Sequence, residues 1–232
     1  MPPQLHKLGK AVADLILPQF CLGCGRAGEI ICSVCLSRMP RLQPPLCARC
    51  GLPQNGGKPC RDCSGHDLAI DGIRSPLLFE SLTREAVHQL KYQNIRVLAR
   101  PLAALLCDYL TQNPLPAEVL VPVPLHPRRL RERGYNQSDL LCRELAKLSG
   151  IATAACLKRK SNTPPQARTA SVAERHHNML GAFACLDGKV RGKKVLLIDD
   201  VATSGATLNA CAVALKQAEA ASVWGLALAR EV

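Results

Sequence analysis

The segment from residue 195 to residue 208, VLLIDDVATSGATL, limits the possible folds more than any other part of the chain. Its first four residues are apolar and predict a buried parallel strand. Asp199 and Asp200 follow at the carboxyl end of that strand, where open α/β sheets bind their ligands. Hydroxyls, a glycine and free backbone N–H groups then precede an apolar helical pattern, which is how a helix N-terminus holds phosphate. An ordinary strand, turn and capped helix would use the same residue types, but here order and spacing match together.

This segment closely resembles the phosphoribosyl pyrophosphate signature of type I phosphoribosyltransferases. The resemblance implies that Asp199 and Asp200 accept hydrogen bonds from the ribose 2- and 3-hydroxyls and act in catalysis. It also implies that the loop after them wraps the 5-phosphate. The expected substrate-binding residues are Asp199, Asp200, Val201, Ala202, Thr203, Ser204, Gly205, Ala206 and Thr207.

Eight of the thirteen cysteines form four Cys-x-x-Cys pairs near the start of the chain. Each such pair can point two thiolates at one tetrahedral ion, and two pairs complete a structural zinc site. Two zinc ions are therefore expected, and the spacing allows either sequential use of the pairs or an interleaved cross-brace. The expected ligands are Cys21, Cys24, Cys32, Cys35, Cys47, Cys50, Cys60 and Cys63.

Disulfides are the alternative use of so many cysteines, but they suit small secreted chains. The stretch from Leu5 to Leu17 has two lysines and a short apolar run, which Asp14 interrupts, and no small-residue cleavage site follows. It therefore fits an amphipathic helix better than a signal peptide. No apolar stretch approaches eighteen residues, so we expect a soluble cytoplasmic protein with reduced thiols and no membrane insertion.

The rest of the chain alternates between strand and helix patterns, which favours a mostly parallel sheet. The expected organisation is an N-terminal helix over residues 1–17, a double zinc ribbon over 18–66 and a phosphoribosyltransferase-like domain over 67–232. The expected strands are 76–80, 119–123, 154–157, 182–185, the strand beginning at 195, and 222–228. The expected helices are 83–92, 96–110 and 137–148.

A basic loop is expected after the strand at 119–123. It places four arginines within six residues, and the last of them begins the string Arg-Gly-Tyr-Asn-Gln. Clustered guanidinium groups at a strand's carboxyl end bind oxyanions, and the phosphoribosyltransferase resemblance implies that the anion is pyrophosphate. Arg131 and Arg133 are also expected to be catalytic. The candidate pyrophosphate ligands are Arg128, Arg129, Arg131 and Arg133.

That string, the cysteine-rich N-terminal ribbon and the phosphate-binding signature together are similar to the ComF family, over nearly the whole chain. The resemblance implies a phosphoribosyltransferase fold, Mg²⁺ with phosphoribosyl pyrophosphate, and an association with DNA uptake and natural transformation. It further implies that residues 158–183 include a mobile flap, with Lys158 and Arg175 as its candidate residues. A solvated basic loop is the alternative for that segment.

The net charge of +12 comes from thirty basic and eighteen acidic residues. A tetra-anionic substrate accounts for part of this excess, because a cationic cleft raises the local concentration of anions. Two functions therefore remain open. The first is Mg²⁺-dependent transfer of phosphoribosyl to an acceptor that the sequence does not identify. The second is a non-enzymatic accessory that handles single-stranded DNA and keeps the fold for ligand sensing or interaction.

Overall fold

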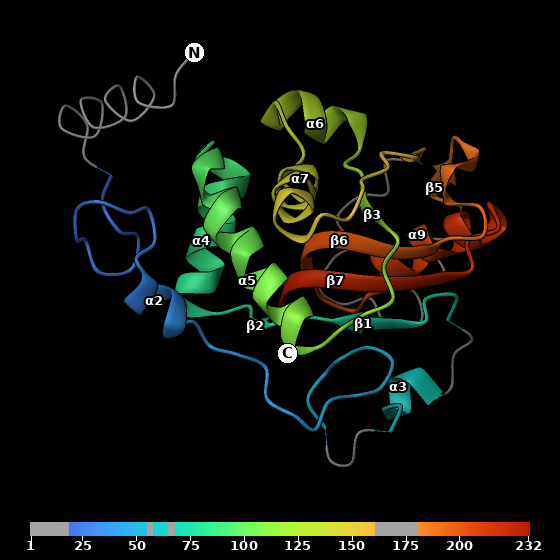
Figure 1. Cartoon of the computed structure of the whole chain (residues 1–232), viewed down its shortest axis with the longest axis horizontal. Coiled ribbons are helices and arrows are strands. Elements are labelled where there is room, and N and C mark those ends of the chain that lie inside the picture. The colour runs from blue at the N-terminus through green and yellow to red at the C-terminus, as the bar shows by residue number, and fades with distance from the viewer. Residues whose placement is uncertain (1–18, 55–57, 65–67, 161–180) are drawn as a thin grey trace.

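The computed structural model describes residues 19–54, 58–64, 68–160 and 181–232. A parallel sheet lies at the centre, in the strand order β1-β7-β6-β3 (Figure 1). A further short strand, β2, pairs with the far end of β7 on the same side as β1. The bounds are β1 Gly72–Arg74, β2 Leu77–Leu78, β3 Val119–Pro122, β6 Lys194–Ala202 and β7 Ser222–Arg230.

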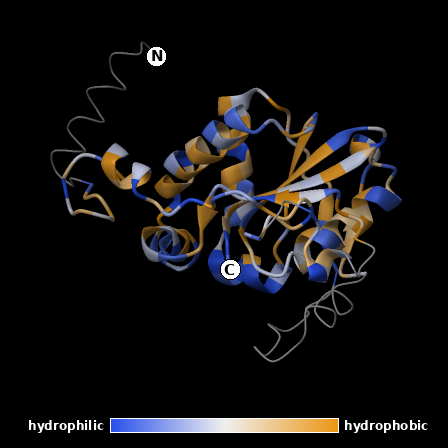
Figure 2. Ribbon diagram, turned by 90° about the horizontal axis from the view of Figure 1, so that it is seen from below, coloured by the Kyte–Doolittle hydropathy of each residue, from blue (hydrophilic) through white to orange (hydrophobic). Residues whose placement is uncertain are grey.

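Each central strand is apolar on both faces because helices cover both sides of the sheet. In β6, Leu196 and Ile198 pack toward one group of helices, while Val195 and Leu197 pack toward the other. This alternation follows from the two-residue repeat of a strand. The strands are accordingly mostly orange in the hydropathy view (Figure 2).

Three helices and a short 3₁₀ turn, η1, lie on one face of the sheet, and α9 covers the other. Helices α5 and α7 pack against each other as well as on the sheet. None of the helices that the structure describes is both long and apolar enough to cross a membrane. The bounds are α4 Ser81–Tyr92, η1 Arg96–Leu98, α5 Ala99–Gln112, α7 Gln137–Ser149 and α9 Ala206–Gln217.

The cysteine-rich part runs along the open edge formed by β1 and β2. Its backbone pairs with that edge at two points: the Ile73 N–H donates to the Arg49 carbonyl at 2.6 Å, and the Leu78 N–H donates to the Pro40 carbonyl at 2.9 Å. Two short helices belong to this part, α2 (Ser33–Ser37) and α3 (Arg61–Ser64). The ribbon is therefore joined to the sheet by main-chain hydrogen bonds as well as by side-chain packing.

The expected mostly parallel sheet is present, but two expected strands do not belong to it. β4 (Leu157–Arg159) and β5 (Phe183–Cys185) form a separate antiparallel pair beside α9, followed by the 3₁₀ turn η2 (Gly188–Val190). Only Leu157 of the expected strand at 154–157 lies in β4; just before that strand, Thr153 forms an isolated parallel bridge with Leu120 of β3, and the Ala154 N–H donates to the Leu120 carbonyl at 2.9 Å. The expected strand at 76–80 is shorter than predicted, and β1 was not predicted at all.

The expected arginine loop is also wrong, because residues Pro127–Arg133 form helix α6. The His126 side chain accepts a hydrogen bond from the Arg128 N–H at the start of this helix, and proline occupies its first turn. Proline is favourable there because the first N–H groups of a helix have no intrahelical partner. The expected helix at 96–110 is likewise divided, into η1 and α5.

Candidate functional site at the carboxyl edge of the sheet

The acidic pair, Asp199 and Asp200, lies within the last part of β6 and is buried. Asp199 accepts hydrogen bonds from the Ser138 hydroxyl at 2.8 Å and from the Asp200 N–H at 2.9 Å. Asp200 forms an ion pair with Lys91 of α4, with 2.9 Å between Nζ and Oδ2. Each carboxylate is therefore held by a partner from a different helix.

Burial, together with the neighbouring negative charge of Asp200, raises the pKa of Asp199 to about 7, against the lowering effect of Ser138 and Lys91. Two carboxylates this close in a dry site do not both ionise readily. A cation or a set of hydroxyl donors placed here would favour the charged form of Asp199.

The Thr203–Thr207 loop connects the acidic pair to α9. Thr203 is exposed and Ser204 half-buried, whereas Gly205 is buried with φ +79°, a backbone conformation that favours glycine. A Cβ at Gly205 would lie 2.7 Å from Ile73 Cδ1, so the end of the Ile73 side chain would have to shift to admit a side chain here. The loop thus leads directly into the N-terminus of a twelve-residue helix, with its glycine packed on the edge strand β1.

A basic pocket of about 710 Å³ lies between α4 and α6. Lys91, which holds Asp200, is one of its lining residues, so the pocket borders the acidic pair. The Tyr135 hydroxyl donates to the Leu90 carbonyl and so ties the segment after α6 to α4. The lining residues are Lys91, Tyr92, Asn94, Arg129, Glu132, Arg133 and Tyr135.

Only two of the four predicted arginines line this pocket. Arg133 donates to the Gln137 side chain and lies over the ring of Tyr92 at 5.2 Å, and Arg129 is half-buried. Arg128 is exposed and pairs with Glu132 one helical turn away, while Arg131 is also exposed. Because α6 is a helix, its arginines point in different directions and cannot all face one ligand.

Of the two predicted flap residues, only Lys158 is among the described residues, and it does not join this site. Lys158 is exposed on β4, and Arg175 lies outside the described residues. Arg159, the neighbour of Lys158, is half-buried. Burial lowers the pKa of Arg159, the positive charge of Arg129 lowers it too, and the negative charge of Asp199 opposes the shift. Arg159 is therefore close enough to Arg129 and Asp199 to be influenced by both charges.

The sequence reasoning missed Lys91, Ser138 and Arg159 as site residues. Lys91 is in an amphipathic helix far from the signature, and only the fold brings it to Asp200. Ser138 follows the Asn136 N-cap of α7, and both side chains accept or donate hydrogen bonds near the ends of β3 and β6. A serine two residues after a capping asparagine, at the start of the helix expected at 137–148, was the available signal.

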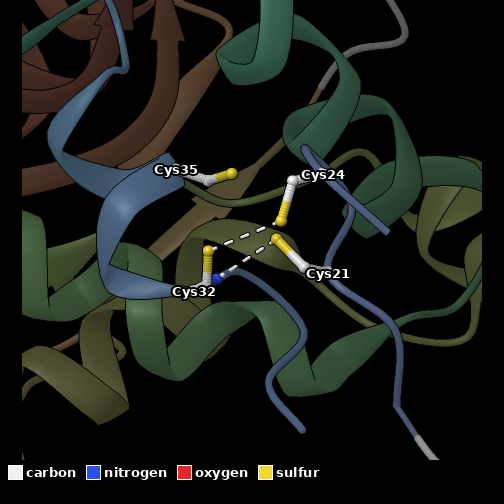
Figure 3. A group of neighbouring side chains, drawn as sticks. All are labelled: Cys21, Cys24, Cys32 and Cys35. Carbon is white, nitrogen blue, oxygen red and sulfur yellow. Dashed lines mark hydrogen bonds between the residues drawn. The ribbon is translucent and has the colours of Figure 1, made fainter. Parts of the chain in front are cut away.

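The first cysteine cluster, Cys21, Cys24, Cys32 and Cys35, brings its four sulfurs within 4.8 Å of one another. Figure 3 shows the side chains converging from the loop at 21–24 and from the start of α2. The Cys32 N–H donates to Cys21 Sγ at 3.3 Å. Although burial opposes it, this and other backbone N–H groups lower the pKa of Cys21 to about 6.

The second cysteine cluster, Cys47, Cys50, Cys60 and Cys63, is equally close-packed. The N–H groups of Cys50 and Cys60 donate to Cys47 Sγ at 3.4 and 3.2 Å. The pKa of Cys47 falls to about 6 for the same reason as at the first cluster, again against burial. The pairs are therefore used sequentially, and the cross-brace does not occur.

Both clusters suit a tetrahedral thiophilic ion. Each offers four thiols around one centre, and backbone N–H donors stabilise one thiol of each as a thiolate. In the described residues, all eight cysteines are free thiols. The donor set is thus that of two Cys₄ zinc-ribbon sites.

Comparison with known proteins yields relatives along most of the chain. The chain is 34% identical over 200 residues to the DNA utilization protein YhgH of Salmonella typhi, and the aligned region covers 83% of this chain and 87% of that protein. It is 32% identical over 213 residues to competence protein F of Haemophilus influenzae, covering 86% and 90%. The chain belongs to the ComF family.

Two family models match this ComF-family protein in separate regions. A double zinc ribbon domain matches residues 12–64, and a phosphoribosyl transferase domain matches residues 138–229. Competence protein ComFC of Bacillus subtilis is 28% identical over 215 residues, covering 87% of this chain and 85% of that protein. The second model begins at Ser138, the residue that holds Asp199, and contains the acidic pair and the Thr203–Thr207 loop.

Proposed function

We propose that this ComF-family protein binds phosphoribosyl pyrophosphate with Mg²⁺ and transfers its phosphoribosyl group to an acceptor. One observation supports this above all: the acidic pair, the Thr203–Thr207 loop and the basic pocket adjoin at the carboxyl edge of one parallel sheet. These are complementary to the three polar parts of the ligand, which are a diol, a phosphate and a pyrophosphate. The proposed arrangement keeps residues 67–232 as the transferase domain and 18–66 as the ribbon.

The acidic pair would receive the ribose. Charged carboxylates are strong acceptors for the 2- and 3-hydroxyls, each contact contributing about 1.5 to 3 kcal/mol. Asp199 must be ionised for this role, and the hydroxyl of Ser138 favours that state. Lys91 would hold Asp200 in the absence of ligand and share it with the ribose when ligand binds.

The loop from Thr203 to Thr207 would hold the 5-phosphate. Its backbone N–H groups and hydroxyls lie at the N-terminus of α9, where the helix dipole favours an anion. Ser204 Oγ accepts from the Ala206 N–H at 3.4 Å, a long bond that a phosphate oxygen can replace. Gly205 lets the chain turn sharply while packed on Ile73.

The basic pocket would take the pyrophosphate. Arg129, Arg133 and Lys91 line it, and Arg159 lies near Arg129. Guanidinium groups form paired hydrogen bonds with phosphate oxygens, which suits a leaving group of high negative charge. Arg128 and Arg131 would contribute through the general positive field of α6 and not by contact.

The transfer itself needs no nucleophile from the protein. The C1–O bond breaks, pyrophosphate departs with the electron pair, and the lone pair of the acceptor forms the new bond to C1. Bound Mg²⁺ would neutralise part of the pyrophosphate charge. The residues of this chain would hold the ribose through Asp199 and Asp200, fix the 5-phosphate, and stabilise the leaving group through Arg129 and Arg133.

Calorimetric titration with three ligands tests this assignment. Arg133→Ala should weaken pyrophosphate and phosphoribosyl pyrophosphate about 10- to 100-fold, as expected for one lost charge-assisted contact, and leave ribose 5-phosphate nearly unchanged. Arg131→Ala is the matched control, because it removes the same charge from the same helix without removing a pocket wall. Equal losses of affinity in both variants would mean that α6 acts only through its general positive charge and that the pocket does not bind pyrophosphate.

Mg²⁺-dependent consumption of phosphoribosyl pyrophosphate by the purified protein separates an enzyme from a ligand sensor. Binding without turnover, tested over a panel of amines and bases as acceptors, would favour the sensor.

We also propose one structural zinc ion at each cysteine cluster. The four-thiol geometry and the N–H donors to sulfur support this. Because binding and folding of such modules are coupled, each ion would contribute about 10 to 16 kcal/mol of apparent binding free energy at neutral pH.

Single-stranded DNA handling is the second candidate function. It is favoured by the net charge of +12 and by relatives called DNA utilization and competence proteins. Fluorescence anisotropy with a labelled oligonucleotide over a range of salt concentrations tests it. A binding constant that falls steeply with salt, with a smaller slope for Arg131→Ala, would place DNA phosphates on α6. No binding near physiological salt would dismiss this function.

A further inference from the structure

Arg230, near the end of β7, carries a charge that nothing in the transferase site uses. Its side chain is only 1% exposed. Within the described residues, Nε and Nη1 have no hydrogen-bond partner. A guanidinium is rarely buried without a counter-charge, because the lost hydration is not recovered. The surroundings of Arg230 should therefore contain an anionic group that these atoms can contact.

The second cysteine cluster lies beside this guanidinium. Cys50, Cys60 and Cys63 line the same small cavity as Arg230. Four thiolates around a divalent metal ion have a net charge of −2. Arg230 would offset half of that charge, and guanidinium N–H groups are suitable donors to bound sulfur.

The opposite wall of that cavity belongs to the proposed phosphate loop. Ser204 and Gly205 line it, and the Cβ position of Gly205 is 3.9 Å from Arg230 Nη1. The cavity measures about 50 Å³, which accommodates ordered water but not a sugar phosphate. Arg230 would therefore support the loop from the side of this cavity and would not contact the ligand itself.

Ile73 of β1 makes a second connection between the same two parts. Its N–H donates to the Arg49 carbonyl inside the second cluster's first Cys-x-x-Cys turn, and its Cδ1 packs under Gly205. Gly51, the residue after Cys50, is so close that a Cβ there would lie 2.5 Å from the Ile73 carbonyl oxygen. Ile73 is thus in close contact with the turn on one side and with the loop on the other, so a shift in the turn can be passed to the loop through Ile73.

We propose that Arg230 is the buried counter-cation of the metal at the second cysteine cluster and that, through Arg230 and Ile73, this metal site positions the phosphate-binding loop. The second half of the proposal depends on the proposed function, since it requires that the loop binds the 5-phosphate. Arg230 is then a positioning residue, and the ribbon is an integral support of the transferase site.

Two variants test the proposal in the full-length, zinc-loaded protein. Arg230→Met keeps the length of the side chain and removes the charge, whereas Arg230→Lys keeps the charge and loses the planar fork. Arg100→Met is the matched control, because it removes one positive charge from the exposed surface of α5. Zinc release to a chromophoric chelator and calorimetric titration with ribose 5-phosphate are the two measurements.

In Arg230→Met, about half of the bound zinc should be released 10- to 100-fold faster than in the parent, as for other losses of an outer partner of a metal site. The Kd for ribose 5-phosphate should rise about tenfold. Arg230→Lys should show smaller changes in the same directions, and it carries the test if Arg230→Met does not fold. Arg100→Met should match the parent in both measurements.

Zinc release and ribose 5-phosphate affinity within twofold of the parent in both Arg230 variants would overturn the proposal. Faster zinc release with unchanged affinity would overturn the coupling to the loop. If the parent protein itself does not bind ribose 5-phosphate, the proposed function fails, and the zinc-release measurement still decides whether Arg230 serves the metal site.

Discussion

Replacing Asp199 by asparagine should stabilise the protein by an amount that grows from mild acid to alkaline pH. Asparagine keeps the oxygen that accepts from Ser138 and from the Asp200 N–H, so the local hydrogen bonds survive. What changes is the charge. Burial raises the pKa of Asp199 from 3.8 to about 7, with Asp200 adding to the shift.

The sign and size of the effect follow from proton linkage. Between about pH 4 and 7 the folded parent binds a proton at Asp199 that the unfolded chain has lost, so its stability falls as the pH rises. Each pKa unit corresponds to about 1.4 kcal/mol, so the roughly three-unit shift sets an upper limit of about 4 kcal/mol. The variant lacks this penalty, and the difference between the two proteins should grow over that pH window and level off above it.

Urea unfolding of both proteins at about pH 5 and pH 8 measures the effect. The two proteins carry the same cysteines, so any loss of metal in acid cancels in the difference. Asp200→Asn is the matched control: it removes the neighbouring charge but leaves Asp199 buried, so part of the pH dependence should remain. A parent-to-variant difference that is the same at both pH values would refute the reasoning. Ligand affinity should have the opposite trend and increase with pH in the parent, because the ribose needs an ionised Asp199.

Three further outcomes are expected. Elemental analysis of freshly purified, reduced protein should find close to two zinc ions per chain, whereas a value near one would mean that one of the two cysteine clusters has another use. Ser138→Ala should move the midpoint of the pH profile for phosphoribosyl pyrophosphate binding upward, since the hydroxyl favours the charged form of Asp199; an unmoved midpoint would contradict this. Gly205→Ala should lower stability by about 1 to 3 kcal/mol in thermal unfolding, because of its positive φ and the Ile73 side chain 2.7 Å from the new Cβ, and a wild-type melting temperature would contradict the packing described.

The strand β6 and the helix α9 could be predicted because their patterns are local. The apolar run at 195–198 is bordered by two acidic residues, and the helix after the loop repeats its apolar residues at helical spacing. The eight zinc-ligand candidates were equally visible. The sequential pairing was not, because both arrangements satisfy the same spacing and only the tertiary structure selects one.

The prediction failed where structure depends on distant partners or on competing signals. β1 has only three residues and contains glycine, and it exists because β7 pairs with it. The clustered charges of residues 127–133 favour a loop, but the proline at the start and the helix-forming residues after it favour helix α6, and the structure has the helix. The contact of Lys91 with Asp200 joins residues far apart in the sequence, which no local pattern reports.

The main-chain bonds between the ribbon and β1–β2 have a consequence for the metal-free protein. The edge of a sheet exposes unpaired N–H and C=O groups, and these recruit other strands unless they are covered. Residues Pro40 and Arg49 occupy that edge on one side, and Ala152 bonds to β3 on the other. Removing the metal would loosen only the ribbon residues that cover β1 and β2. Chelated protein should therefore not stay as a monomer with an unfolded tail, but associate edge to edge through β1 and β2.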